Sequence, residues 1–189
     1  FAATTSLPTA RIGHTSVAYN GYLYVIGGNS GSGALSDGGR RDGGDIGVLG
    51  VFAATTSMPT VRRYHTSVAY NGYLYVIGGS DSDGIVRDVR VAPINANGTL
   101  GAFAATTSFS TGRYGHTSVA YEGYLYVVGG RDYWGNALSD VQVARINADG
   151  TLDGFAPTTY LPYGRGGHTS VVINGYLYVV GGDDGYSYL

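Results

Sequence analysis

Pairs of short apolar runs recur four times along the chain, and each pair is joined by a polar residue with glycine and closed by Gly-Gly. The copies span residues 14–28, 65–79, 116–130 and 168–182. In the first copy, 15–19 and 22–26 each have the length of a strand, and Asn20-Gly21 between them favours a tight hairpin whose turn residues have positive φ. Both alternate faces of 22–26 are apolar, which predicts a strand covered on both sides. The closing glycines predict a bend or a close backbone approach.

A second pair of strands completes each repeat. It is clearest where 140–144 alternates between polar and apolar residues, turns at Asp149-Gly150 and resumes at Phe155. Each repeat of about fifty residues is therefore predicted to hold four antiparallel strands, which we letter A to D. The first repeat departs from this pattern, because GGRRDGGDIGV stands where its siblings alternate valine. We expect weak or irregular pairing for residues 38–47.

Composition agrees with an all-β chain and excludes several classes of protein. The 189 residues include 33 glycines and 18 tyrosines, with 13% charged residues, which is typical of a turn-rich β protein. A net charge of −2 indicates no nucleic-acid partner. Without cysteine there is neither a disulfide nor a thiolate metal site, and no apolar run is long enough for a membrane helix. Low charge and a first residue other than methionine favour an extracellular or cell-surface location.

Histidine and arginine recur at fixed positions before strand A. All four histidines share one position of the repeat, and an arginine precedes each by three residues. The histidines are His14, His65, His116 and His168, and the arginines are Arg11, Arg62, Arg113 and Arg165. We interpret both sets as structural, with the histidine tying its loop to backbone or to the next repeat and the arginine pairing between repeats. The alternatives are a metal or proton-transfer site for histidine and an anion site for arginine.

The pattern R-x-x-H-T-S-V, then N-G-Y-L-Y-V-I-G-G, then L-S-D-V and an aromatic after a turn resembles the kelch repeat. The resemblance covers the whole chain and implies an all-β propeller of four-stranded antiparallel blades, with strand A nearest the central channel. Kelch repeats often carry Trp on strand D, where this chain has phenylalanine. The implied divisions of a single array, 1–189, are an outer strand at 1–7, blades at 14–57, 65–108 and 116–160, and a partial blade at 168–189.

About four blades are fewer than the five to eight with which kelch propellers usually close. Four periods amount to roughly 205 residues, about sixteen more than the chain has. We therefore expect this array to belong to a larger ring, either as a homo-oligomer or as a fragment of a longer repeat chain, because open blade edges favour pairing.

No catalytic, metal or cofactor residues are expected. The radical cofactor of kelch-type copper oxidases needs a cysteine, which this chain lacks. An epimerase-like site is the alternative, yet no unpaired acid or base stands out among the repeats. The acidic turns at Asp81, Asp83 and Asp183 resemble calcium loops, and we interpret them as solvated turns.

The loop between strands B and C differs in every repeat while the framework is nearly constant. Binding groups concentrate in such loops on a rigid scaffold. The longest loop holds Arg131, Asp132, Tyr133 and Trp134, residue types common at interface hot spots, and Asp81, Asp83, Asp183 and Tyr186 share its rim. We predict a non-catalytic binding or structural module that presents these loops to a protein or glycan partner. The alternatives are an enzyme with a rim or channel site, a scaffold without ligand, or neutral drift with Trp134 folded onto its own blade.

Overall fold

The computed structural model describes residues 6–42 and 50–189, and within these ranges every regular element is a β-strand. Three four-stranded antiparallel sheets and a final two-stranded sheet follow one another along the chain. In each four-stranded sheet the pairing order is A-B-C-D, so the all-β, blade-like architecture expected from the sequence is confirmed. No helix of a length and hydropathy suited to crossing a membrane occurs in the described ranges.

The strands of each blade are bounded as follows. Blade 1 contains β1 (Thr15–Tyr19), β2 (Tyr22–Ile26), β5 (Gly38–Asp42) and β6 (Ala53–Thr55), with a small hairpin of β3 (Asn29–Ser30) and β4 (Gly33–Ala34) in its B–C loop. Blade 2 contains β7 (Thr66–Tyr70), β8 (Tyr73–Ile77), β9 (Val89–Pro93) and β10 (Ala104–Thr106). Blade 3 contains β11 (Thr117–Tyr121), β12 (Tyr124–Val128), β13 (Asp140–Arg145) and β14 (Ala156–Tyr160), and blade 4 contains β15 (Thr169–Ile173) and β16 (Tyr176–Val180).

The A–B hairpins have the turn geometry that Asn-Gly favours. Asn20 and Gly21 have φ of 47° and 78°, so both lie in the left-handed region, as a type I′ turn requires. Glu122 adopts the same φ of 47° in blade 3 although glutamate has no special preference for it. The flanking strands therefore impose the turn even where the local sequence favours it less.

The expectation of irregular pairing in the first repeat was wrong for residues 38–42, and residues 43–47 lie outside the described ranges. β5 pairs in continuous register with β2, from Tyr22 opposite Asp42 to Ile26 opposite Gly38, and also pairs with β6. Backbone groups alone make this ladder, so two neighbouring strands can hold a segment that lacks alternating side chains. Arg41 takes the position that Ala92 holds in blade 2, and its guanidinium lies over the ring of Phe52 at 5.1 Å.

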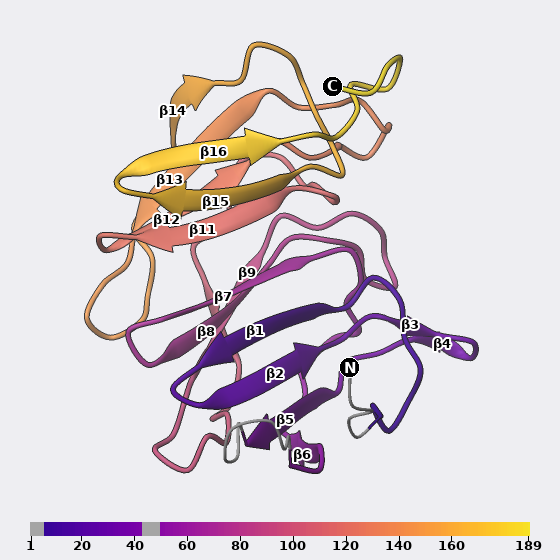
Figure 1. Ribbon diagram of the computed structural model, residues 1–189, viewed down its shortest axis with the longest axis vertical. Coiled ribbons are helices and arrows are strands. Elements are labelled where there is room, and N and C mark those ends of the chain that lie inside the picture. Colours follow the sequence, from indigo (N-terminus) through magenta and orange to yellow (C-terminus); the bar gives the residue numbers. More distant parts are fainter. Residues whose placement is uncertain (1–5, 43–49) are drawn as a thin grey trace.

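The blades are stacked in chain order with their A strands side by side, as Figure 1 shows in the progression from indigo to yellow. Each apolar core lies between two blades. The face of blade 1 that carries Tyr24 and Ile26 packs against Leu74 and Val76 of blade 2, and blades 2 and 3 repeat the arrangement. We call the tyrosine-bearing face of a blade its trailing face and the leucine-bearing face its leading face.

Glycine is required at the end of strand B because the next blade approaches closely there. A Cβ built on Gly27 would lie 2.5 Å from the carbonyl oxygen of Arg62, and Gly27 has a φ of 59°. The second glycine of the pair, Gly28, donates to the same carbonyl oxygen at 2.7 Å. The predicted close approach is therefore confirmed and lies at the joint between blades.

Burial on both faces, expected for every B strand, fails in blade 4. Tyr24 of β2 and Tyr75 of β8 are fully buried, whereas Tyr178 of β16 is 49% exposed. The sequence of β16 is nearly the same as that of β2, so the difference comes from position: blades 1 to 3 are each followed by another described blade, and blade 4 is not.

Candidate functional site

The histidine that recurs in the repeat takes part in a chain of hydrogen bonds between adjacent blades. Ser67 Oγ of blade 2 donates to Thr15 Oγ1 of blade 1 at 2.7 Å, and that Thr15 oxygen lies 2.9 Å from His65 Nε2. The Thr15 oxygen can accept from Ser67 and either donate to or accept from His65 Nε2, so the contact fits either neutral tautomer of the ring. The same chain of hydrogen bonds joins blades 2 and 3 through His116 and blades 3 and 4 through His168. The histidines thus tie each blade to the preceding one, whereas the sequence predicted a bond to backbone or to the next repeat.

Burial keeps these histidines neutral. Desolvation, assisted by the charge of Arg62, lowers the pKa of His65 to about 3. Desolvation and the charge of Arg113 lower the pKa of His116 to about 3. Desolvation and the charge of Arg165 lower the pKa of His168 to about 4. Within the described ranges no cluster of three or more His, Cys, Asp or Glu could hold a metal ion. The geometry therefore favours the structural interpretation of the histidines.

The repeated arginine pairs within its own blade, so the expected pairing between blades was wrong for its side chain. Arg113 is fully buried, and its two terminal nitrogens donate to the two carboxylate oxygens of Asp140 at 2.9 and 2.8 Å. It also donates to the carbonyl oxygen of Gly129 at 2.8 Å. Arg11 with Asp37 and Arg62 with Asp88 repeat this arrangement. A carboxylate already occupies the place where an anion would bind.

These ion pairs also lower the pKa values of the aspartates in blades 2 and 3. Burial alone would raise the pKa of Asp88 and of Asp140, but the hydrogen bonds and charge of Arg62 and Arg113 outweigh it and lower both values. Arg165 keeps the equivalent bond, to the carbonyl oxygen of Gly181 at 3.1 Å, while no carboxylate within 50–189 accepts from it. The pair therefore fastens strand C to the loop before strand A in blades 1 to 3.

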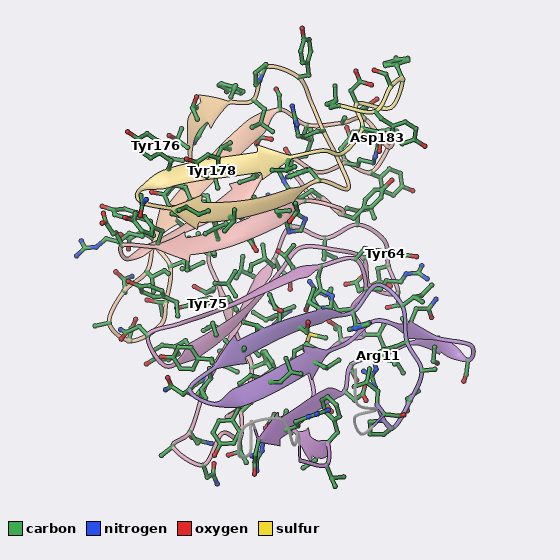
Figure 2. The ribbon with its side chains drawn as sticks, in the orientation of Figure 1. Arg11, Tyr64, Tyr75, Tyr176, Tyr178 and Asp183 are labelled. Atoms are coloured by element: carbon green, nitrogen blue, oxygen red, sulfur yellow. The ribbon has the colours of Figure 1, made fainter. Side chains whose placement is uncertain are left out.

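One end of the blades forms a rim from the B–C loops and the loops that precede strand A. Tyr114 and Arg131 exchange two backbone hydrogen bonds of 3.0 and 2.8 Å there, and Gly166 and Asp183 do the same in blade 4. Arg131 also forms an ion pair with Asp183 of the next blade. Figure 2 shows Asp183, Tyr64 and Arg11 at this end of the molecule. The structure thus brings together two of the rim residues expected from separate loops.

Hydrogen bonds to a buried aspartate fix the shape of the longest rim loop. Asp132 is only 8% exposed, and its Oδ1 accepts from the backbone nitrogens of Trp134 and Asn136, both at 2.9 Å. Asp132, expected at the binding surface, is therefore a residue that shapes the loop. Asp81 accepts from the backbone nitrogen of Asp83 at 2.8 Å and has the same kind of role in blade 2.

Two aromatic side chains project from this loop. Trp134 is 79% exposed and Tyr133 is 69% exposed, and their rings meet edge to face at 5.9 Å and 84°. Tyr186 in the loop of blade 4 is 98% exposed. The interpretation in which Trp134 folds onto its own blade does not match this exposure.

Tyr64 is a rim residue that the sequence analysis missed. It has a φ of 55°, a left-handed conformation that the other three repeats give to Gly13, Gly115 and Gly167, and it is 44% exposed. A bulky residue held in this conformation costs free energy, and such strain is concentrated at functional positions. The signal was present in the sequence, because the repeats read R-x-G-H except for Arg-Arg-Tyr-His at 62–65.

The cavities of the described ranges bear on the possibility of catalysis. A hollow of about 400 Å³ along the A strands is lined by serine, valine and alanine with Tyr121. A cavity of about 150 Å³ in blade 1 contains Arg11 and Asp37, which are already paired with each other. A rim hollow of about 280 Å³ is lined by residues 183 and 185–188. None of these three cavities gathers titratable acids or bases from different blades.

Comparison with known proteins gives the family. A family model described as the KLHDC2/KLHL20/DRC7 Kelch-repeats domain matches residues 48–182. The chain belongs to the kelch-repeat family. Its four-stranded sheets are kelch blades, which confirms the propeller expected from the repeated motif.

Individual relatives share the kelch array over part of their length. Spermatocyte protein spe-26 of Caenorhabditis elegans is 30% identical over an alignment 189 positions long, which covers 95% of this chain and 30% of that protein. Rho GTPase-activating protein gacHH of Dictyostelium discoideum is 24% identical over an alignment 139 positions long, which covers 68% of this chain and 9% of that protein. The structure of YjhT shares the fold with a TM-score of 0.76 at 17% identity, covering 96% of this chain and 61% of YjhT. The kelch array described here thus spans less than two thirds of each of these proteins.

Proposed function

We propose that this kelch array is a non-catalytic binding module that presents its variable B–C loops to a protein or glycan partner. The observation that carries the proposal is the pair Tyr133 and Trp134, two exposed rings in edge-to-face contact on a loop fixed by Asp132. Large aromatic side chains that are rigid before binding supply contact area at little entropic cost.

The surroundings of the pair support a continuous binding surface. The ring of Tyr133 lies against Gly84 of blade 2, since a Cβ built on that glycine would be 3.7 Å away. Arg131 reaches Asp183 of blade 4, so the loop spans three blades. The ion pair of Arg131 with Asp183 contributes to the polar border that hot-spot aromatics usually have. The absence of acids and bases from different blades in the three cavities supports binding over catalysis.

The experiment uses Trp134 as its own probe, because it is the only tryptophan of the chain. Wild-type protein is screened against a printed glycan array and a displayed protein library, and each hit is titrated while tryptophan emission is recorded. We expect emission to shift to shorter wavelength, and a Tyr133→Ala/Trp134→Ala variant to lose roughly 30-fold or more in affinity, as is usual for interface hot spots.

The matched control is Tyr124→Ala, which removes an aromatic ring that is 43% exposed on strand B of blade 3. It should keep the affinity of the wild type. The double variant should change the free energy of unfolding by less than about 1 kcal/mol, since both rings are solvent-exposed. Binders that ignore the double variant, the lack of any binder, or conversion of a bound glycan would each contradict the proposal.

A further inference from the structure

The turn between β9 and β10 carries the acceptor pattern of N-linked glycans, Asn-x-Ser/Thr. Of the eight asparagines in the chain, only Asn97 is followed two residues later by serine or threonine, which is Thr99, and Gly98 between them satisfies the requirement for a residue other than proline. An N-linked glycan is bulky and needs a surface position. Because the pattern is short and occurs often by chance, the geometry of the turn has to show whether it is usable.

The hydrogen bonds of this turn leave the acceptor nitrogen of Asn97 free. The residue is exposed, and its Oδ1 accepts from the backbone nitrogen of Thr99 at 3.1 Å and from Thr99 Oγ1 at 2.7 Å. Asn95 Nδ2 donates to the same hydroxyl oxygen at 2.9 Å and so fixes its orientation. Within residues 6–42 and 50–189 no hydrogen bond engages Asn97 Nδ2. The amide and the hydroxyl that the pattern requires are therefore in contact, with the reacting nitrogen open to solvent.

The turn is anchored to blade 1 by its glycine and not by Asn97. The Tyr24 hydroxyl donates to the carbonyl oxygen of Gly98 at 3.0 Å, and a Cβ built on Gly98 would lie 2.5 Å from the ring of Tyr22. These contacts bury Gly98, whereas the neighbouring Asn97 is exposed. A glycan on Asn97 would extend into solvent without separating blades 1 and 2.

Asn97 lies at the end of the blades opposite the rim. Strand C begins after the B–C loop and ends at the C–D turn, so β9 places its two flanking loops at opposite ends. Figure 1 shows the rim end by the β3–β4 hairpin at the right, while the A–B turns lie at the left. A glycan at residue 97 would leave the rim loops uncovered, and the inference does not depend on the function proposed for them.

We propose that Asn97 is the attachment site of an N-linked glycan. In this modification Asn97 Nδ2 forms a bond to C1 of the first sugar of a lipid-linked oligosaccharide. The bond between C1 and the pyrophosphate oxygen breaks, the lipid pyrophosphate leaves, and Nδ2 loses one proton. An oligosaccharyltransferase catalyses the transfer as the chain enters the secretory pathway. The extracellular or cell-surface location that we expect from the sequence is the location that this modification requires.

Blade 3 holds a natural counterpart of this turn without the acceptor nitrogen. Asp149 Oδ1 accepts from the backbone nitrogen of Thr151 at 3.0 Å and from its hydroxyl at 2.7 Å, as Asn97 accepts from Thr99. The two turns thus have the same hydrogen bonds, and the aspartate lacks the amide that a sugar would modify. Asp149→Asn supplies this amide, and we expect it to create a second attachment site.

The experiment is intact-mass and peptide mass spectrometry on two samples. One is the protein purified from the organism that produces it, and the other is the chain secreted from cultured animal cells behind a cleavable signal peptide. Both should carry one glycan on Asn97, which peptide-N-glycosidase removes while converting the asparagine to aspartate. Thr99→Ala should lose the glycan and Thr99→Ser should keep it, because serine retains the hydroxyl. Protein retained inside the cells is analysed too, so that a variant that folds poorly is still scored.

The matched variant Asp149→Asn should carry a glycan on each of the two turns. An unmodified Asn97 in either sample, or a glycan that persists in Thr99→Ala, would overturn the proposal, most directly if Asp149→Asn were modified only at residue 149. A variant Asp149→Asn that stays bare at residue 149 would contradict the role of the turn geometry. Asn97→Gln should bind rim ligands with the affinity of the wild type, so failure of either proposal leaves the other standing.

Discussion

Acidification from pH 7.5 to pH 5 should destabilise the protein through the histidines that join its blades. The folded-state pKa is about 3 for His65 and His116 and about 4 for His168, whereas an unfolded histidine has a pKa of about 6.5. A pKa that is lower in the folded state means that the unfolded state binds protons first as pH falls. The contribution of these histidines to the free energy of unfolding is therefore fully present above pH 6.5, and it is lost as the pH falls from 6.5 to the folded-state pKa.

The size of the decline follows from these values. At pH 5 an unfolded histidine is nearly fully protonated and the buried one is nearly fully neutral, which corresponds to about 2 kcal/mol for each residue. The three together amount to about 6 kcal/mol, comparable with the total stability of many domains. The carboxylates of Asp88 and Asp140 add a loss of the same sign only at lower pH, because their pKa values lie below the ordinary range for aspartate.

The assay is urea denaturation followed by near-ultraviolet circular dichroism at several pH values between 7.5 and 5. A His116→Gln variant isolates one contribution, because its amide can still bond to Thr66 but does not titrate in this range. The variant should show about 2 kcal/mol less pH-dependent loss than the wild type. A flat wild-type profile, or the same decline in both proteins, would refute the assignment of the loss to buried neutral histidine.

Two further predictions concern stability, each with a matched control. Arg113→Ala should lower the free energy of unfolding by about 3–5 kcal/mol because it leaves the Asp140 carboxylate without its buried partner. Arg165→Ala removes a bond to a backbone carbonyl and should lower it by less than about 1.5 kcal/mol. Equal losses in chemical denaturation would contradict the stabilising role of the bidentate pair. Gly79→Ala should lower the melting temperature further than Gly72→Ala, because both residues have positive φ but a Cβ on Gly79 would lie 2.5 Å from a carbonyl oxygen while the one on Gly72 meets open space. Equal melting temperatures would show that φ alone sets the cost.

The candidate site was partly predictable. The change of B–C loop sequence between repeats indicated the rim, and Arg131, Tyr133, Trp134 and Asp183 all lie there. The separation of their roles was not predictable, because an aspartate that accepts backbone hydrogen bonds inside a loop has the same sequence signal as one that faces solvent. Tyr64 could have been found by comparing the repeats at one position, since it replaces glycine where the backbone needs a positive φ.

The sequence by itself determined the blades. Alternating apolar residues, Asn-Gly turns and the period of about fifty residues act through neighbours in the chain, so β1 with β2 and the equivalent hairpins follow directly from local preferences. Tertiary structure decided what depends on residues far apart. It formed β5 from a segment without alternation because adjacent strands supplied the backbone partners, and it left β16 half exposed where β2, of nearly the same sequence, is buried. A strand carries its pattern with it, but its burial depends on whether another blade lies against it.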